Sequence, residues 1–142
     1  MMELQRWREK RGLNFHLQPK HWPFDPKLAD GVAIAAIEAG LNPEPFMRSV
    51  FKSAWEDQLD LADAATVVGL ADKAGLPGEK LAARAPTAEI AAIYEQNRQD
   101  ALAAGVFGAP GYVLDGEVFW GQDRIELLGD ALKSGRAPYR AV

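Results

Sequence analysis

The sequence predicts a helix-rich α/β fold in which a helix, a strand and a series of helices precede a strand hairpin and a final helix. Two observations carry this prediction. Apolar residues recur at helical spacing behind helix-start residues and stop at glycines, and an Asp115-Gly116 dipeptide lies between two short apolar runs. The 142 residues are 48% hydrophobic and 25% charged, which is typical of a globular chain long enough to bury a core.

The beginning of the chain contains one expected helix and one expected strand. Residues 2–11 carry Leu4 and Trp7 at helical spacing and stop at Gly12, which suits a helix C-terminus. Residues 13–18 alternate apolar and polar side chains, which is the period of a half-buried strand. We therefore expect a helix and then a strand before the proline-rich stretch PKHWPFDP.

The middle of the chain is expected to be a packed cluster of helices. A short helix is expected within LPGEKLAARA, and the other helices begin behind capping residues, which are Asp25, Asn42, Asp63 and Thr87. The helix behind Asn42 carries two adjacent apolar rows, Phe46, Val50, Ala54 and Met47, Phe51, Trp55. Two rows make a broad apolar face, so this helix is expected to pack against several neighbours.

The end of the sequence predicts a compact order of loop, hairpin and helix. One helix ends at Gly105, and Gly-Ala-Pro-Gly at residues 108–111 interrupts regular secondary structure. Two strands then flank Asp115-Gly116, and the final helix starts after Gly121. Both positions of a two-residue hairpin turn need positive φ, which Asp and Gly tolerate. This order of elements resembles the second half of the thioredoxin fold.

Composition excludes several kinds of function. The absence of cysteine rules out thiol nucleophiles, dithiol redox chemistry and cysteine-bound zinc in this chain. His16 and His21 do not have the spacing of a helical metal motif, and no metal site is predicted. The net charge of −4 offers no basic surface for nucleic acid, and no apolar run is long enough to span a membrane. We expect neither kind of partner, and we expect a cytoplasmic location.

Residues 108–123 combine two features that suit a peptide-like ligand. Ala109 precedes a proline and is held extended, so its N–H and C=O groups can pair with a peptide alongside, and the flanking glycines keep side chains out of the way. The start of the last helix suits a carboxylate, while Asp123 in the same turn suits an ammonium group. The γ-glutamyl end of glutathione carries both groups beside a peptide backbone. The alternative is that Asp123 only partners the helix dipole.

The stretch GVFGAPGYVLDGEVFWGQDRIELL resembles the C-terminal signature of the 2-hydroxychromene-2-carboxylate isomerase family, whose relatives are the kappa-class glutathione transferases and the DsbA oxidoreductases. ELQRWREKRGLNF, HWPFDPKLAD, PEPFMRSVF and ADAATVVGLADKAGL occur in the family's order. The resemblance implies an α/β, thioredoxin-like fold of the DsbA and kappa type with an all-helical insertion. It divides the chain into residues 1–26, a remnant of the thioredoxin-like domain, residues 27–87, the helical insertion, and residues 88–142, the C-terminal half of that domain.

The resemblance also implies a glutathione site. In the family the loop proline is cis, the residue before it pairs with the cysteinyl backbone of glutathione, and a polar pair after Trp-Gly holds the γ-glutamyl group. The matching residues here are Ala109 and Pro110 for the first role, and Gln122 and Asp123 for the second. Arg124 is expected to steady the helix start rather than to contact the ligand.

The sequence departs from the family pattern at its beginning. Family members open with a strand, a helix with the serine that activates the glutathione thiol, and a second strand. This N-terminal β-α-β third is expected to be missing. Because the family serine is expected upstream of Met1, no catalytic residue is assigned in this chain. Ser49, Ser53 and Ser134 do not substitute, because the first two lie on the insertion and the third in the last helix. A hairpin without neighbouring strands exposes an edge, which favours association, and a homodimer is expected.

The resemblance implies a glutathione-dependent isomerase of 2-hydroxychromene-2-carboxylate type, which converts a small aromatic ring-cleavage intermediate between cis and trans forms through a glutathione adduct. The loop KHWPF is the candidate wall for the substrate, with His21 or Trp22 in contact with it. The alternative is that Trp22 and Phe24 pack in the core. Two other functions stay open, a catalytically silent glutathione-binding or assembly module and a kappa-like glutathione transferase.

Overall fold

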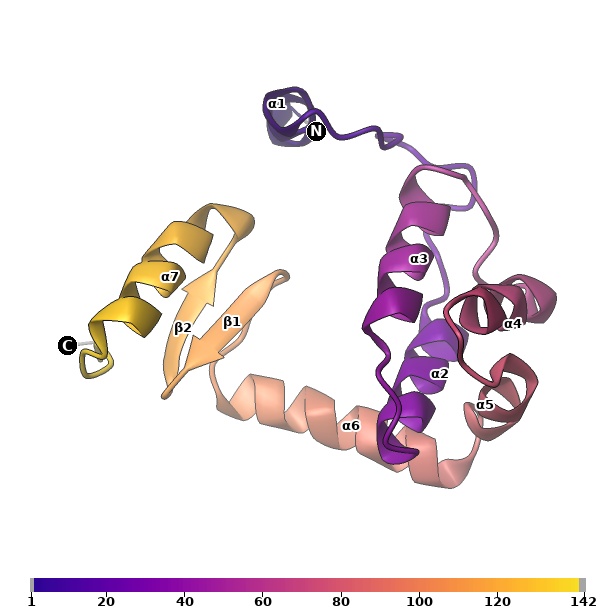
Figure 1. Cartoon of the computed structure of the whole chain (residues 1–142). Coiled ribbons are helices and arrows are strands. Elements are labelled where there is room, and N and C mark those ends of the chain that lie inside the picture. The colour runs from indigo at the N-terminus through magenta and orange to yellow at the C-terminus, as the bar shows by residue number, and fades with distance from the viewer. Residues whose placement is uncertain (1, 141–142) are drawn as a thin grey trace. The chain divides into compact units, whose positions relative to one another are not determined.

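The computed structural model describes residues 2–140 and divides into two compact units, one up to Tyr94 and one from Glu95 onward (Figure 1). The division falls inside α6 (Ala88–Ala103). We call residues 2–94 the helical unit and residues 95–140 the hairpin unit. None of the helices within residues 2–140 has the length and apolarity needed to cross a lipid bilayer.

The helical unit confirms the predicted cluster of helices. In chain order these are α1 (Met2–Arg11), α2 (Lys27–Glu38), α3 (Glu44–Trp55), α4 (Ala64–Lys73), α5 (Gly78–Arg84) and the first turns of α6. The capping residues act as predicted, because Asp25 and Asn42 each accept a hydrogen bond at 3.1 Å from the backbone N–H two residues on, and Asp63 accepts one at 2.8 Å from Thr66. Local side-chain chemistry therefore sets where these helices begin.

A continuous apolar core holds α2 to α6 of the helical unit together. α2 is buried along most of its length, and Phe46 of α3, Leu81 of α5 and Ile90 of α6 are almost completely buried. A Cβ atom placed on Gly31 would lie only 2.8 Å from the Cβ of Ala85. The glycine thus allows α2 to approach the end of α5 closely.

The predicted strand over residues 13–18 is wrong. The only strand pair within residues 2–140 is the hairpin, and the segment between α1 and α2 runs without a partner strand. Its backbone is anchored instead to helices, because the N–H of His16 donates to the carbonyl of Trp55 at 2.8 Å and the guanidinium of Arg8 donates to the carbonyl of Phe15 at 3.2 Å. Alternating side chains indicate a strand only when a neighbouring strand is there to pair with it.

The hairpin unit confirms the predicted hairpin and final helix. β1 (Gly111–Leu114) pairs antiparallel with β2 (Glu117–Trp120), with Leu114 opposite Glu117. The two turn residues have φ values of 52° and 84°, as a two-residue turn of this kind requires. A 3₁₀ turn, η1 (Gln122–Arg124), leads into α7 (Ile125–Ser134), which ends at a left-handed Gly135.

The two faces of the hairpin differ in what covers them. Phe119 is buried on the face it shares with Tyr112, and it lines a cavity with residues of α7. The other face carries Val113 and Trp120, which are 45% and 53% exposed. Apolar side chains on this second face therefore remain largely accessible within the hairpin unit.

Candidate functional site

The proline loop between α6 and β1 is tied directly to the start of the last helix. The Ala109–Pro110 peptide bond is cis, as the family resemblance implies. The carbonyl of Pro110 accepts a hydrogen bond at 2.9 Å from the N–H of Gly121, the residue just before η1. This bond places the predicted pair of loop residues beside the predicted pair Gln122 and Asp123.

Ala109 presents unpaired backbone groups at this loop. The residue is exposed, and among the hydrogen bonds within residues 2–140 none engages its N–H or its carbonyl. Exposed and unpaired peptide groups next to a strand are the groups through which an extended peptide adds to a protein. The geometry therefore allows the peptide pairing that the sequence predicts at Ala109.

The structure shows a requirement for glycine at positions 108 and 111 that the sequence does not reveal. From the sequence, they are expected to leave room for a ligand. In the structure, the chain's own side chains occupy that space, because a Cβ on Gly108 would lie 2.4 Å from Nε1 of Trp120 and a Cβ on Gly111 would lie 2.9 Å from Cγ1 of Val106. Only the approach of the Trp120 ring to the loop in three dimensions reveals this requirement.

The start of the last helix carries two opposite charges in contact. The guanidinium of Arg124 donates to the carboxylate of Asp123 at 2.8 Å, and both side chains are about half exposed, at 50% and 48%. The Asp123 carboxylate folds back over Gly121, where a Cβ would meet its Oδ1 at 2.4 Å. Gly121 has a φ of 111°, so this position suits glycine for its backbone as well. A charged carboxylate is thus held near the loop and open to solvent.

The prediction for the catalytic serine concerns a position before Met1. Met1 lies outside residues 2–140, which the structure describes, so an upstream serine stays a prediction. Within the described residues, Ser49 and Ser53 lie on α3 and Ser134 lies on α7, which are the helices where the sequence places them. All three are therefore remote in the chain from the proline loop at residues 108–111.

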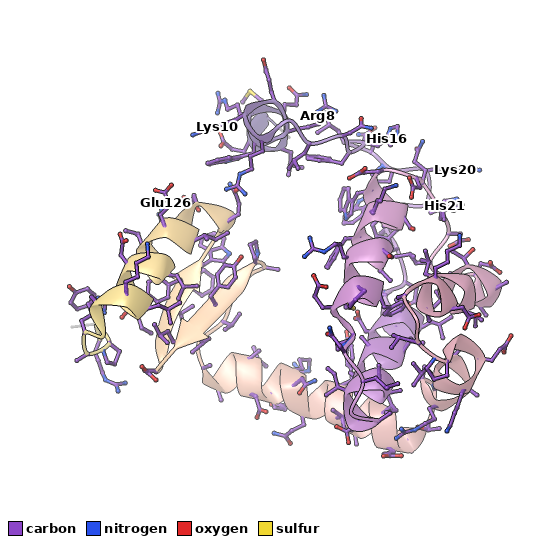
Figure 2. All side chains as sticks on the ribbon, in the orientation of Figure 1. Arg8, Lys10, His16, Lys20, His21 and Glu126 are labelled. Atoms are coloured by element: carbon purple, nitrogen blue, oxygen red, sulfur yellow. The ribbon has the colours of Figure 1, made fainter. Side chains whose placement is uncertain are left out.

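The predicted substrate residues His21 and Trp22 lie in the helical unit, on the segment that leads from α1 to α2. Figure 2 labels His21 on this segment. Nδ1 of His21 lies 3.6 Å from a carboxylate oxygen of Asp60. The ring of Trp22 lies 5.1 Å from that of Phe24 and 5.3 Å from that of Trp55, between ring centres. Trp22 nevertheless stays 58% exposed, so it packs on one side and is accessible on the other.

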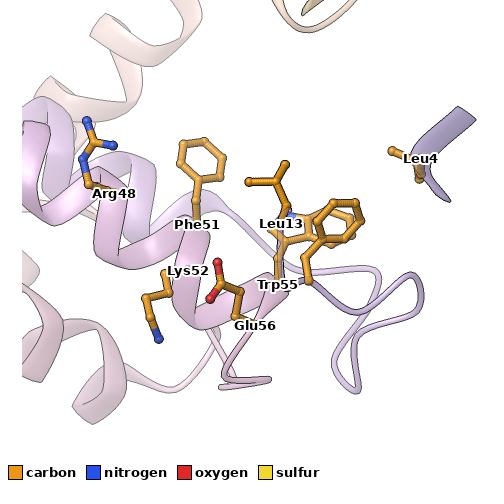
Figure 3. A pocket seen from close by; sticks show the side chains of 8 residues that line it. Leu4, Leu13, Arg48, Phe51, Lys52, Trp55 and Glu56 are labelled. Carbon is orange, nitrogen blue, oxygen red and sulfur yellow. The ribbon is translucent and has the colours of Figure 1, made fainter. Parts of the chain in front are cut away.

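An apolar groove of about 490 Å³ in the helical unit was not predicted as a site (Figure 3). Its lining residues are Leu4, Leu13, Phe15, Arg48, Phe51, Lys52, Trp55 and Glu56. The available signal was the second apolar row of α3, which the core covers only in part, with Met47 and Trp55 partly buried against it. Phe46 is fully buried, whereas Phe51 is 61% exposed in the groove. Arg48 and Lys52 at its margin are already paired, with Glu44 and Asp57.

Comparison with known proteins shows which family the chain resembles. The pattern of the DSBA-like thioredoxin domain family matches residues 1–133. A 2-hydroxychromene-2-carboxylate isomerase of Sphingobium xenophagum is 29% identical over 131 residues, which cover 90% of this chain and 64% of that protein. A solved structure of a selenomethionine-containing 2-hydroxychromene-2-carboxylate isomerase matches with a TM-score of 0.73 at 20% identity, over 94% of this chain and 64% of that one. The helix-rich, DsbA-like thioredoxin fold predicted from the sequence is thereby confirmed, and the chain spans slightly less than two thirds of the length of these relatives.

Proposed function

Because the chain belongs to the DsbA-like thioredoxin domain family, we propose that it serves as a glutathione-dependent isomerase of 2-hydroxychromene-2-carboxylate type. The observation that supports this most is the hydrogen bond from Gly121 to Pro110, at 2.9 Å. It ties the loop that contains Ala109 and Pro110 to the residue just before Gln122 and Asp123, and so supports a shared role of these four residues. The proposal includes a homodimer and a cytoplasmic location.

The proposed ligand contacts follow from the groups on that surface. The unpaired N–H and C=O of Ala109 pair with the cysteinyl backbone of glutathione, beside Pro110. Asp123 holds the ammonium group of the γ-glutamyl end, and Gln122 hydrogen bonds to the same end. The Asp123 carboxylate supports this role because it is half exposed, with Arg124 as its ion-pair partner.

The contribution of these residues to the reaction is positioning. When bound, glutathione supplies the thiol that adds to the conjugated chain of the aromatic substrate and later leaves, after rotation about the bond that the addition makes single. Ala109, which pairs with the cysteinyl backbone, and Asp123, which holds the γ-glutamyl end, together fix where the cysteine side chain points. Fixed orientation turns a bimolecular addition into an effectively unimolecular one. His21 and Trp22 form the proposed contact to the aromatic substrate.

A second candidate function is a silent glutathione-binding module, and the hydrogen bonds of the described serines bear on it. The hydroxyls of Ser49 and Ser134 each donate at 3.0 Å to a carbonyl of their own helix, Pro45 and Ala131, and Ser53 is buried. None of the serines within residues 2–140 offers a hydroxyl at the proline loop. Binding without activation of the thiol is therefore consistent with the groups present. A kappa-like glutathione transferase role would use the same binding surface.

Calorimetry with glutathione tests the binding part of the proposal. We expect Asp123→Ala to weaken the affinity about ten- to hundredfold, because a hydrogen bond to a charged group is lost. The matched control is Asp100→Ala, which removes an exposed aspartate of α6 and should leave the affinity unchanged. Equal affinities of the wild type and Asp123→Ala contradict the γ-glutamyl assignment.

Two further measurements separate the candidate functions. Cysteinylglycine lacks the γ-glutamyl end, so Asp123→Ala should not change its affinity if the assignment is right. Absorbance assays of 2-hydroxychromene-2-carboxylate with glutathione present then test the isomerase role. Glutathione binding without acceleration of the isomerisation favours the silent module, and conjugation of an electrophile without isomerisation favours the transferase.

A further inference from the structure

The tail that follows α7 returns to the hairpin and holds it with an ion pair. Both terminal nitrogens of Arg136 donate to the carboxylate of Glu117 on β2, at 2.7 and 2.9 Å. The backbone N–H of Tyr139 donates to the same carboxylate at 2.8 Å, and the Arg136 guanidinium lies 3.9 Å from the centre of the Tyr139 ring. The side chains of Glu117 and Arg136 are only 15% and 26% exposed. We call Glu117, Arg136 and Tyr139 the clasp.

The clasp lies at the end of β2 and α7 opposite the candidate site. β2 begins at Glu117 and leads through Gly121 and η1 into α7, which runs back along it (Figure 1). Arg136 follows directly behind the other end of α7. The two elements are therefore joined by the chain at the site end and by the bidentate ion pair at the far end. A segment fixed at both ends has less freedom to change its direction than one fixed at a single end.

Apolar packing between the two elements is sparse. A cavity of about 410 Å³ is lined by Phe119 of β2, by Leu127 and Ala131 of α7, and by the clasp itself. Among the described residues of the hairpin unit, Phe119 and Ala131 are the only buried apolar side chains. Side chains that line a cavity lose part of the contact that holds a core rigid. The polar contacts of the clasp therefore contribute much of what holds β2 against α7.

We propose that the clasp of Glu117, Arg136 and Tyr139 is a positioning device that keeps Gly121 and the following turn beside Pro110, and so sets the affinity for the γ-glutamyl part of the ligand. The ligand part of this inference rests on the proposed function. The positioning part rests on the clasp geometry alone. Glu117 touches no ligand and acts only through the direction of β2.

The pKa of Glu117 is consistent with an ion pair to Arg136 that forms at neutral pH. The hydrogen bond from Arg136 keeps the pKa of the Glu117 carboxyl below its usual range, and the N–H of Tyr139 adds to this effect. Other titratable groups that line the same cavity are limited to Asp130 of α7. Both contacts favour the ionised form of the carboxyl over the protonated form.

The test compares Glu117→Gln, Arg136→Gln and the double variant with Arg98→Gln. Arg98 makes an equally bidentate pair with Glu95, but both residues lie on α6, so this control removes the same chemistry without releasing β2. Residue-resolved hydrogen exchange at the N–H of Gly121 reports the bond to Pro110 directly. We expect exchange there to rise about tenfold or more in the clasp variants, glutathione affinity to fall, and the double variant to be no worse than either single one.

Each outcome decides one of the two parts. Unchanged exchange at Gly121 in folded clasp variants overturns the positioning role. So does an equal rise at Val106, whose N–H bonds to Ala101 at the end of α6, because that would mean general loosening of the hairpin unit. If Arg136→Gln fails to fold, Arg136→Lys keeps the charge, loses the bidentate contact and should give a smaller rise. A wild type that binds no glutathione contradicts the proposed function, while the exchange comparison still decides the clasp.

Discussion

The helical unit and the hairpin unit are held together in different ways. All but two of the buried apolar side chains of the described residues lie in the helical unit, where they form one continuous core. The hairpin unit has Phe119 and Ala131 buried, and relies on a tight turn, a few backbone hydrogen bonds and the clasp. Burial of apolar surface is the dominant favourable contribution to folding, so the helical unit should resist perturbations that loosen the hairpin unit.

This difference matters because the candidate glutathione residues lie in the weaker unit. Phe107 and Trp120, next to the proline loop, are 72% and 53% exposed, with ring centres 4.9 Å apart. A site on an element with little core is positioned by specific polar contacts. The following predictions test whether the two units differ in this way.

The largest effect is expected from Phe46→Ala in the helical unit. Phe46 is completely buried, so its truncation should lower the free energy of unfolding by about 3–5 kcal/mol. Urea denaturation followed by circular dichroism measures this loss. The control is Phe51→Ala on the same helix, where the side chain is 61% exposed and a much smaller change is expected. Similar losses for both variants would show that the core is not where the helical unit gains its stability.

Close helix packing predicts opposite signs for two glycine substitutions. Gly31→Ala should destabilise the helical unit by about 1–3 kcal/mol, because the added Cβ would lie 2.8 Å from that of Ala85. Gly69 on α4 has no atom within 4 Å of such a Cβ, so Gly69→Ala should stabilise by about 0.5–1 kcal/mol. Thermal denaturation of both variants gives the comparison. A stable Gly31→Ala variant contradicts the contact between α2 and α5.

In the hairpin unit the turn should matter more than any side-chain burial. Gly116 has a φ of 84°, and a Cβ there would meet only Nη1 of Arg140, at an ordinary contact distance of 3.7 Å, so Gly116→Ala mainly tests the backbone and should cost about 1–2 kcal/mol. Hydrogen exchange of the β1 and β2 amides measures the loss, and the amides of α4 should not change. The control is Gly129→Ala on α7, which has open space and an ordinary helical conformation. Equal exchange in the two variants would contradict a requirement for positive φ at the turn.

Acid should loosen the hairpin unit before the helical unit. Arg98 lowers the pKa of Glu95 to about 2, and Arg136 lowers that of Glu117, so both carboxylates stabilise the folded hairpin unit above their ordinary pKa. That contribution is lost as the pH falls below the ordinary carboxyl range, towards about 2 in the case of Glu95. In the helical unit, the hydrogen bond from Thr66 lowers the pKa of Asp63, so protonation of Asp63 destabilises the fold. Burial raises the pKa of Asp30, so protonation of Asp30 removes the free-energy cost of burying its charge. The two effects there oppose one another.

Fluorine NMR of 5-fluorotryptophan follows this difference, because Trp55 lies in the helical unit and Trp120 in the hairpin unit. On acidification the Trp120 resonance should shift or broaden at a higher pH than that of Trp55. Glu117→Gln removes one of the two carboxyls of this unit whose pKa is lowered, and should flatten the dependence of the Trp120 resonance on pH. Simultaneous loss of both resonances would mean that the two units unfold together.

The sequence by itself determined the elements whose cause is local. Asp25, Asn42 and Asp63 accept hydrogen bonds from the first backbone N–H groups of their helices, and Asp115-Gly116 adopts the positive φ values that a two-residue turn needs. Each of these depends on atoms within a few residues. Family resemblance extended that prediction to the fold and to the identities of the four candidate site residues.

Only the tertiary structure decided whatever depends on a distant partner. Residues 13–18 have the alternation of a strand, but among residues 2–140 no strand pairs with them, and the N–H of His16 donates instead to the carbonyl of Trp55 at the end of α3. Gly108 is required by the ring of Trp120, and Glu117 meets Arg136 across nineteen positions of the sequence. No short-range pattern signals such pairs, because each residue alone is ordinary and the contact arises when the chain folds back on itself. The position of the candidate site depends on these contacts.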